Sequence, residues 1–151
     1  MPYIIKEKTL AILPFNKGSI IYEYYSEPIK SNDCPYQIIN INCYLNNSSL
    51  EGRQKASSYL IGTIYKPPIV LDETKNIIII PTHSANNKAC CWVVLNNILN
   101  YHSKNNNKTI IEFKNNQKLE ININYQKFDK QVLRATRLES ALRGRNHKKY
   151  L

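Results

Sequence analysis

The residues with the clearest chemical meaning are the arginines and lysines near the C-terminus of this 151-residue chain. Residues 130–151 hold seven basic side chains and one acidic side chain, Glu139, whereas the preceding residues hold 14 basic and 10 acidic ones. Such a local concentration of positive charge is typical of a surface that binds a polyanion. The seven basic residues are Lys130, Arg134, Arg137, Arg143, Arg145, Lys148 and Lys149.

Arginine is the more informative of the two residue types, because its planar guanidinium can fork onto phosphates or enter a narrow, electronegative minor groove. Arg53 and Lys55 are expected on one helix in the middle of the chain, with Lys66 extending the same basic surface. A second patch is expected on the C-terminal helix and tail. The candidate DNA-binding residues are therefore Arg53, Lys55, Lys66, Arg134, Arg137, Arg143, Arg145, Lys148 and Lys149.

Catalysis is not predicted. The three histidines, His83, His102 and His147, are scattered, and the four glycines form no nucleotide-binding loop. No Gly-x-Ser-x-Gly, His-Glu-x-x-His or Gly-x-x-x-x-Gly-Lys motif occurs. A thiol enzyme built on Cys90 and a distant histidine is the weakest of three functional alternatives, since sequence does not establish their proximity. We predict no catalytic residue and no cofactor.

The four cysteines, Cys34, Cys43, Cys90 and Cys91, do not have the spacing of a structural zinc site. Zinc sites usually contain close Cys-x2-4-Cys pairs, whereas the first two cysteines here are nine residues apart and the last two are adjacent. Free cysteine commonly packs as a small buried hydrophobe. We therefore predict no metal site and expect these residues in the core.

The composition indicates one folded domain. Hydrophobic residues make up 42% of the chain, more than a disordered basic tail carries, and the length suffices for a real core. No apolar run approaches the roughly 20 residues that a membrane span needs. The charges at Lys6, Glu7 and Lys8 would interrupt the apolar core of a signal peptide. We expect a cytoplasmic, nucleoid-associated protein with no membrane partner.

In the N-terminal half, Thr9 to Phe15 and Ser19 to Tyr25 are predicted strands joined as a hairpin through Asn16-Lys17-Gly18. Gln37 to Leu45 is read as a short helix. A second helix is expected to follow Ser48-Ser49, as a hydroxyl cap, and to end at Gly62. The two prolines of Lys66-Pro67-Pro68-Ile69 exclude this segment from the interior of a helix. Pro67 should also favour an extended backbone conformation at Lys66.

In the C-terminal half, Ile77 to Ile80 is predicted to be a central strand buried on both faces, and Trp92 to Leu95 another strand. Thr109 to Phe113 and Leu119 to Tyr125 form a predicted β-hairpin around an Asn-rich turn. A helix from Lys127 to Arg143, stopped by Gly144, buries an apolar stripe at spacings of three and four. The stripe comprises Phe128, Val132, Ala135, Leu138 and Leu142.

These elements predict a single α+β domain with a largely antiparallel sheet, β-hairpins, a short middle helix and a basic C-terminal helix. Residues 1–143 would form the DNA-binding domain, and residues 144–151 a basic tail. The 15 aromatic residues also permit a single-stranded RNA-binding or ribosome-associated module, in which bases stack on a sheet. The spread of Tyr22, Tyr24 and Tyr25 over both faces of one strand favours a core role instead.

An ordered series of residues resembles the ComK family of competence transcription factors. It begins with Ala11 to Pro14, departs from the family pattern at Asn47 and Cys91, where glycine is usual, and continues to about residue 138. The matching residues are Cys43, Ser48, Ser49, Gly52, Arg53, Lys66, Pro67, Pro68, Ile69, Asp72, Pro81, Thr82, Cys90, Trp92, Tyr125, Phe128, Gln131, Val132 and Arg134.

The resemblance implies a sequence-preferring activator that binds double-stranded DNA and switches on genes for DNA uptake. It implies an approach through the minor groove at paired AT-rich boxes, as a homo-oligomer, and RNA polymerase is a possible partner. Minor-groove recognition of A/T tracts relies on groove width and inserted arginines, which agrees with the basic residues of this chain.

Overall fold

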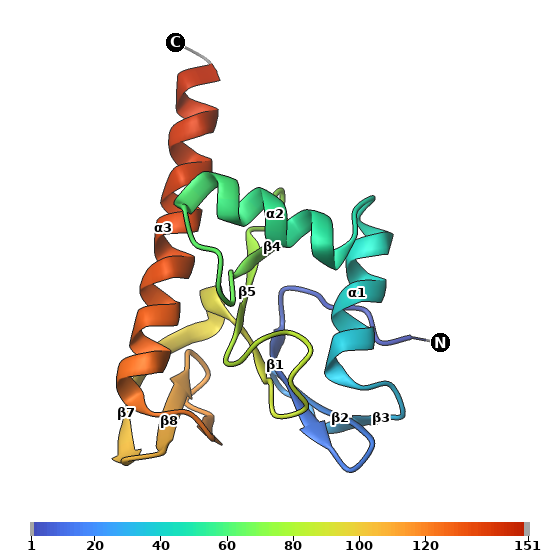
Figure 1. The fold of residues 1–151 in the computed structure, drawn as a ribbon. Helices are drawn as coiled ribbons and strands as arrows, with labels where there is room; N and C mark the ends of the chain where they lie inside the picture. The colour runs from blue at the N-terminus through green and yellow to red at the C-terminus, as the bar shows by residue number, and fades with distance from the viewer. Residues whose placement is uncertain (1, 150–151) are drawn as a thin grey trace.

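The computed structural model describes residues 2–149, and side chains as far as Gly144. Helices and antiparallel sheets form one compact α+β arrangement, which confirms the predicted fold class (Figure 1). The larger sheet has six strands in the order β3-β2-β1-β6-β5-β4, and the smaller has three in the order β7-β8-β9. No helix within the described residues is both long and apolar enough to cross a bilayer.

The chain begins its larger sheet with the predicted hairpin of β1 (Thr9–Phe15) and β2 (Gly18–Glu23). Asn16 in the turn has φ 54°, a left-handed conformation that asparagine tolerates. Gly18 has no space for a Cβ, which would lie 2.0 Å from the Ser31 carbonyl oxygen of the neighbouring strand. That strand, β3 (Ile29–Ser31), forms one edge of the sheet.

Two helices follow, α1 (Pro35–Leu45) and α2 (Leu50–Ile61), as predicted. The Ser49 hydroxyl caps α2 by accepting a hydrogen bond from Gly52 N at 3.0 Å, and Gly62 ends the helix with φ 70°. In the link between the helices Asn47 has φ 63°. Asparagine therefore provides a left-handed turn conformation at the position where the family resemblance implies glycine.

The next three strands, β4 (Ile69–Asp72), β5 (Ile77–Pro81) and β6 (Trp92–Val94), complete the larger sheet. β5 lies between β4 and β6, and its alternating isoleucines enter two separate apolar clusters, one on each face of the sheet. The prediction of a central strand buried on both faces is confirmed. Leu95 belongs to a short 3-10 helix, η1 (Leu95–Asn97), rather than to β6.

The smaller sheet comprises β7 (Ile98–Asn105), β8 (Lys108–Phe113) and β9 (Lys118–Ile121). The predicted hairpin is the β8–β9 pair, in which Ile111 lies opposite Leu119 and Asn116 supplies a positive φ of 71° in the turn. The alternation of β9 turns Leu119 and Ile121 inward, as expected for a half-buried strand.

The last helix, α3 (Tyr125–Lys149), is longer than predicted. Phe128, Ala135 and Leu138 are fully buried, so the apolar stripe is correct. The predicted stop at Gly144 is wrong, because the helix continues through this residue. Glycine weakens a helix but ends one only where the chain takes a left-handed turn, and Gly144, unlike Gly62, has no positive φ.

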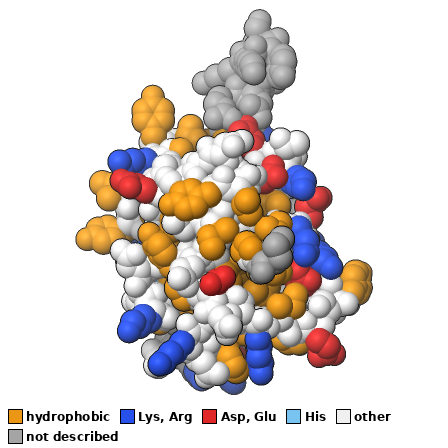
Figure 2. Space-filling model, turned by 90° about the vertical axis from the view of Figure 1, so that its right-hand side faces the viewer, with side chains coloured by type: hydrophobic (Ala, Val, Ile, Leu, Met, Phe, Trp, Pro, Cys, Tyr) orange, Lys and Arg blue, Asp and Glu red, His pale blue; other side chains and the backbone are white. Residues whose placement is uncertain are grey.

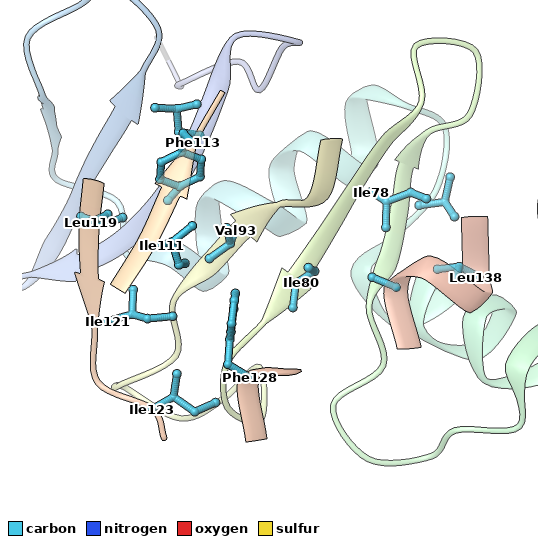
Figure 3. Close-up of a cluster of buried hydrophobic side chains, with 14 of the residues drawn as sticks. Ile78, Ile80, Val93, Ile111, Phe113, Leu119, Ile121, Ile123, Phe128 and Leu138 are labelled. Carbon is cyan, nitrogen blue, oxygen red and sulfur yellow. The ribbon is translucent and has the colours of Figure 1, made fainter. Parts of the chain in front are cut away.

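The core has one layer on each face of the larger sheet. On one face, Ile38 and Ile39 of α1 pack with Ile12 of β1 and Trp92 of β6. On the other, the smaller sheet and α3 pack against Ile80 and Val93, with Phe128 between them (Figure 3). Cys43, Cys90 and Cys91 are buried, which confirms their predicted packing role, while Cys34 is half-buried.

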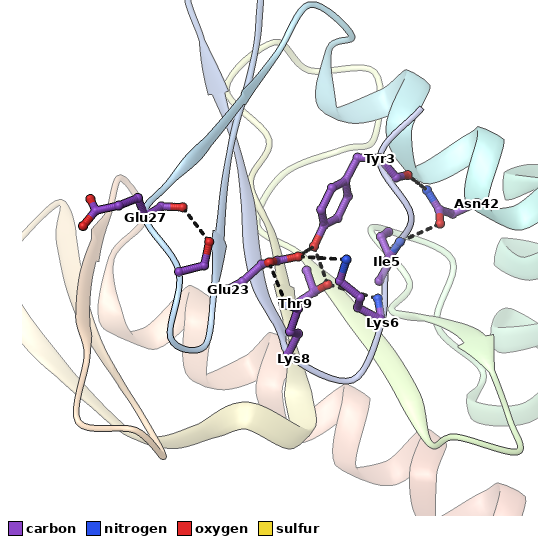
Figure 4. A network of polar contacts seen from close by, with 9 residues as sticks. Tyr3, Ile5, Lys6, Lys8, Thr9, Glu23, Glu27 and Asn42 are labelled. Atoms are coloured by element: carbon purple, nitrogen blue, oxygen red, sulfur yellow. Dashed lines mark hydrogen bonds and ion pairs between the residues drawn. The ribbon is translucent and has the colours of Figure 1, made fainter. Parts of the chain in front are cut away.

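A polar network fastens the N-terminal segment to this core (Figure 4). The Asn42 side chain accepts a hydrogen bond from Ile5 N at 2.8 Å and donates one to the Tyr3 carbonyl oxygen at 2.9 Å. Glu23 is nearly buried, accepts a hydrogen bond from the Tyr3 hydroxyl and pairs with Lys6 and Lys8. The two ammonium groups offset part of the cost of burying this carboxylate.

Candidate nucleic-acid interface

Five basic residues belong to α3 and to the loop that follows α2. Spacings of three, four and three residues place Lys127, Lys130, Arg134 and Arg137 on one side of α3, next to the buried stripe. Lys66, in the loop of residues 62–68, lies near enough to Lys127, Lys130 and Arg134 for their charges to lower its pKa. We call these five residues the cationic cluster.

The electrostatics indicate that four charges of this cluster, those of Lys66, Lys127, Lys130 and Arg134, influence one another. The pKa of Lys66 is lowered, first by burial and then by Arg134, Lys127 and Lys130. Burial, followed by Lys66 and Lys127, lowers the pKa of His83. Because a neighbouring cation disfavours the protonated form of each group, a bound polyanion would relieve the repulsion.

Side chains of α3 hold the backbone of the loop. Gln131 Nε2 donates to the Lys66 carbonyl at 2.9 Å and to the Pro81 carbonyl at 2.7 Å. Arg134 donates to Gln131 Oε1 at 2.7 Å and to the Tyr65 carbonyl at 3.4 Å, and Arg137 donates to the Ile61 carbonyl at 3.4 Å. Arg134 thus helps to position the loop, and Arg137 holds the last residue of α2, just before the loop begins.

Lys66 does not have the predicted extended conformation, because its φ is 47°. Pro67 disfavours the right-handed helical conformation for the residue before it, and tertiary contacts select among the remaining backbone conformations. Here the hydrogen bond from Gln131 fixes the Lys66 carbonyl, and the chain accepts a conformation that is uncommon for lysine. The loop is therefore held in a strained shape by α3.

Arg53 and Lys55 lie in the first half of α2, whereas the cluster begins beyond its end. Arg53 Nη2 donates to the Asn46 carbonyl at 3.1 Å, and its Nε is buried without a partner among the described residues. Lys55 is exposed and pairs with Glu51 at 3.0 Å. The structure therefore does not bring these two predicted contacts together with Lys66, Arg134 and Arg137.

The predicted contacts near the C-terminus extend along α3. Arg143 is exposed and pairs with Glu139 at 2.6 Å, and Glu139 also accepts a hydrogen bond from Asn76. The side chains of Arg145, Lys148 and Lys149 lie outside the part of the chain that the structure describes. These residues stay predicted contacts.

Carboxylates pair with some of the described basic side chains and not with others. Glu23 pairs with Lys6 and Lys8, and Glu120 pairs with Lys104 and Lys108. Among the described side chains, no carboxylate forms an ion pair with any member of the cluster. Other lysines, such as Lys17 and Lys88, also form no ion pair among the described side chains, but in the cluster several such cations lie near one another. On the face shown in Figure 2, basic and acidic side chains are interspersed. The cluster is therefore the strongest candidate for a polyanion site.

The cysteines near this site are poor nucleophiles. Burial raises the pKa of Cys90 to about 11 and, together with Cys90, the pKa of Cys91 to about 12. Both thiols are therefore protonated at neutral pH, which is unfavourable for a thiol enzyme. Within the described residues no three His, Cys, Asp or Glu side chains gather as a metal site would require.

Sequence reasoning missed three residues of this site. Lys130 was counted in the basic C-terminal segment but not among the DNA-binding candidates, and Lys127 was not singled out, although their spacing from Arg134 along one helix side would have identified them. His83 joins through the loop between β5 and β6. No local pattern indicates that position, because only the tertiary fold brings this loop to α3.

Comparisons with known proteins identify the family of this chain. The model of the "ComK protein" family matches residues 1–147. The chain is 29% identical over 151 residues to the competence transcription factor of Bacillus subtilis (strain 168), covering 95% of this chain and 76% of that protein. No solved structure gives a significant match. A match over nearly the whole chain shows that it belongs to the ComK family.

Proposed function

We propose that the protein is a competence transcription factor that binds double-stranded DNA and activates genes for DNA uptake. It would prefer AT-rich sites and read them from the minor groove, at the nucleoid. The single observation that carries DNA binding is the cationic cluster, whose like charges are held together without a neutralising carboxylate among the described residues. Family membership and the similarity to a competence transcription factor support the regulatory role.

The fold favours duplex DNA over single-stranded RNA. A sheet that binds RNA needs an open face bearing aromatic side chains on which bases stack. Here apolar clusters cover both faces of the larger sheet, and Trp92 is fully buried in one of them. The basic side chains instead lie along α3 and the adjacent loop, where they suit phosphates and a groove.

Duplex binding across a salt series tests the proposal. If five to eight phosphates are contacted, log affinity should fall with log salt at a slope of about −4 to −7. The duplexes would carry spaced A- and T-tracts, and fluorescence anisotropy would report binding. A flat salt dependence, or stronger binding to single-stranded RNA of the same length, would refute the proposal.

Groove and sequence preference need separate experiments. A minor-groove ligand such as netropsin should compete with the protein on A/T-tract duplexes. A G·C-rich duplex of equal length should bind more weakly at the same salt, because groove width and the exocyclic amino group of guanine differ. Equal affinity for both duplexes would remove sequence preference while leaving DNA binding intact.

Assembly is also part of the proposal. Paired boxes suit a homo-oligomer, since symmetric sites mirror symmetric proteins. Sedimentation of the protein with duplexes carrying one or two boxes would report the stoichiometry. Cooperative binding to two boxes is expected. Contact with RNA polymerase would be tested by transcription in vitro from a promoter that bears the selected boxes.

A further inference from the structure

Two large apolar side chains project from the loop that carries Lys66. Ile64 is 86% exposed and Tyr65 is 76% exposed. Such exposure is unusual for adjacent large hydrophobic residues beside a core in which Thr63, Pro67 and Pro68 are buried. The loop thus buries residues on both sides of this pair and presents the pair itself to solvent.

The backbone that carries the pair is held in place. Hydrogen bonds from α3 reach three carbonyls of this segment, those of Ile61, Tyr65 and Lys66. Gly62 and Lys66, which flank the pair, both have positive φ, at 70° and 47°. Glycine adopts positive φ freely, so the strained position is Lys66, and strained residues held by their neighbours often mark a binding element. The projecting pair is therefore presented by a preorganised support.

The charges around the pair indicate which partner it meets. Lys66 follows Tyr65 directly, and Arg134 reaches the Tyr65 carbonyl, so cations flank the apolar tip. A protein partner would need acidic side chains around an apolar pocket, whereas a DNA groove offers phosphates on both sides of stacked, apolar bases. Minor-groove proteins insert apolar wedges between base pairs in this way.

We propose that Ile64 and Tyr65 form an apolar wedge that enters the minor groove and partly unstacks one base step, while the cationic cluster holds the flanking phosphates. This inference rests on the proposed DNA binding. It adds the residues through which the protein would distinguish base steps that unstack easily from those that do not. Pyrimidine–purine steps such as T-A unstack most easily, so a T-A step at the wedge should bind more tightly than an A-A step.

The test places 2-aminopurine at successive positions of a bound A/T-rich duplex, because this base brightens when it is unstacked. With the parent protein, the fluorescence of 2-aminopurine should increase at one base step. The double variant Ile64→Ala, Tyr65→Ala should lose that signal and bind about tenfold more weakly, the order expected for losing an apolar contact with a base. Its salt dependence should keep the parent slope, since every cation remains.

Tyr44→Ala is the matched control. Tyr44 is 59% exposed near the end of α1, on the other side of the larger sheet from α3, and its variant should retain both signal and affinity. Thermal unfolding of all variants would confirm folding, which exposed side chains should not affect.

The possible results separate the two proposals. If the parent binds the duplex without increasing 2-aminopurine fluorescence at any step, the wedge is overturned and DNA binding still holds. The same conclusion follows if the double variant increases the fluorescence at the same step as the parent. Failure of the parent to bind any duplex would refute the proposed function and the wedge with it. A double variant that changes only the oligomeric state would assign the tip to a second copy of the chain, and would also overturn the wedge.

Discussion

At Lys66, burial and the charges of Arg134 and Lys127 lower the pKa of the ammonium group. The folded pKa is below the unfolded value, so at neutral pH the protonated lysine reduces the stability of the native state. This reduction should fade as pH rises toward the ordinary lysine pKa. The residue that would serve DNA binding is thus unfavourable for the free protein, as is common at functional sites.

The first prediction concerns Lys66→Gln. Loss of this charge should raise the melting temperature of the free protein, because the repulsion disappears, and should reduce the salt slope of duplex binding by about one unit. Lys30→Gln, on edge strand β3 at the opposite edge of the sheet from β4, is the matched control for binding and should leave the salt slope unchanged, although it removes the contact of Lys30 with the Phe15 ring. An unchanged slope in Lys66→Gln would remove Lys66 from the interface.

The second prediction concerns pH and His83. Burial, Lys66 and Lys127 lower the pKa of His83 in the free protein, and a nearby phosphate would raise it in the complex. Binding then takes up a proton, so affinity should be highest below the free pKa and should decline as pH rises through the bound pKa.

Anisotropy titrations between pH 5.5 and 7.5 at constant ionic strength measure this effect. His83→Asn keeps a polar partner for Thr82, which lies 2.8 Å from His83 Nδ1, and should make the affinity nearly independent of pH. A pH dependence that persists in the variant would assign the proton to another group. The free protein should show the opposite trend in stability, which falls as pH drops through the unfolded histidine pKa.

At the scale of elements, two glycines that were both predicted to end a helix have different roles. Gly62 ends α2 with φ 70°, whereas Gly144 lies inside α3 and a Cβ there would meet no atom within 4 Å. A helix-ending glycine needs the left-handed conformation, which alanine resists, while a glycine within a helix only adds chain entropy to the unfolded state.

The third prediction uses this difference. Gly144→Ala should raise the free energy of unfolding by about 0.5–1 kcal/mol, because alanine is the better helix former. Gly62→Ala should lower it by about 1 kcal/mol through strain at positive φ. Urea unfolding with unchanged m-values measures both. A destabilised Gly144→Ala variant would mean that α3 ends at this residue.

At the scale of the whole molecule, the folded domain and the last turns of α3 are proposed to divide the work of binding. Arg134 contacts the loop and Arg137 contacts the end of α2, both within the domain, whereas Arg143 lies beyond Leu142, the last residue of the buried stripe. Charges held in a fixed arrangement can select a groove shape, while charges at the end of a helix add affinity to any duplex.

The fourth prediction is that removal of residues 144–151 weakens binding to A/T-rich and G·C-rich duplexes by the same factor. The ratio of the two affinities, measured by anisotropy at one salt concentration, should not change. Arg134→Gln is the comparison, and it should reduce this ratio because Arg134 supports the loop. Loss of selectivity on truncation would contradict the division between domain and tail.

Local sequence patterns determined most of the elements. The alternation in β9, the Ser49 cap and the stripe from Phe128 to Leu142 each depend on residues close together in the chain. For the same reason the charge of α3 and the buried isoleucines of β5 were predictable. The family resemblance also rested on sequence alone, and the family match over residues 1–147 confirms it.

The tertiary structure decided what those patterns could not express. It brought Lys66 and His83 to α3, separated Arg53 and Lys55 from that group, and gave Lys66 a left-handed backbone through a hydrogen bond from Gln131. Each of these features depends on residues far apart in sequence. Periodicity and capping record local free energies, whereas a binding surface arises from long-range packing and the charges it brings together.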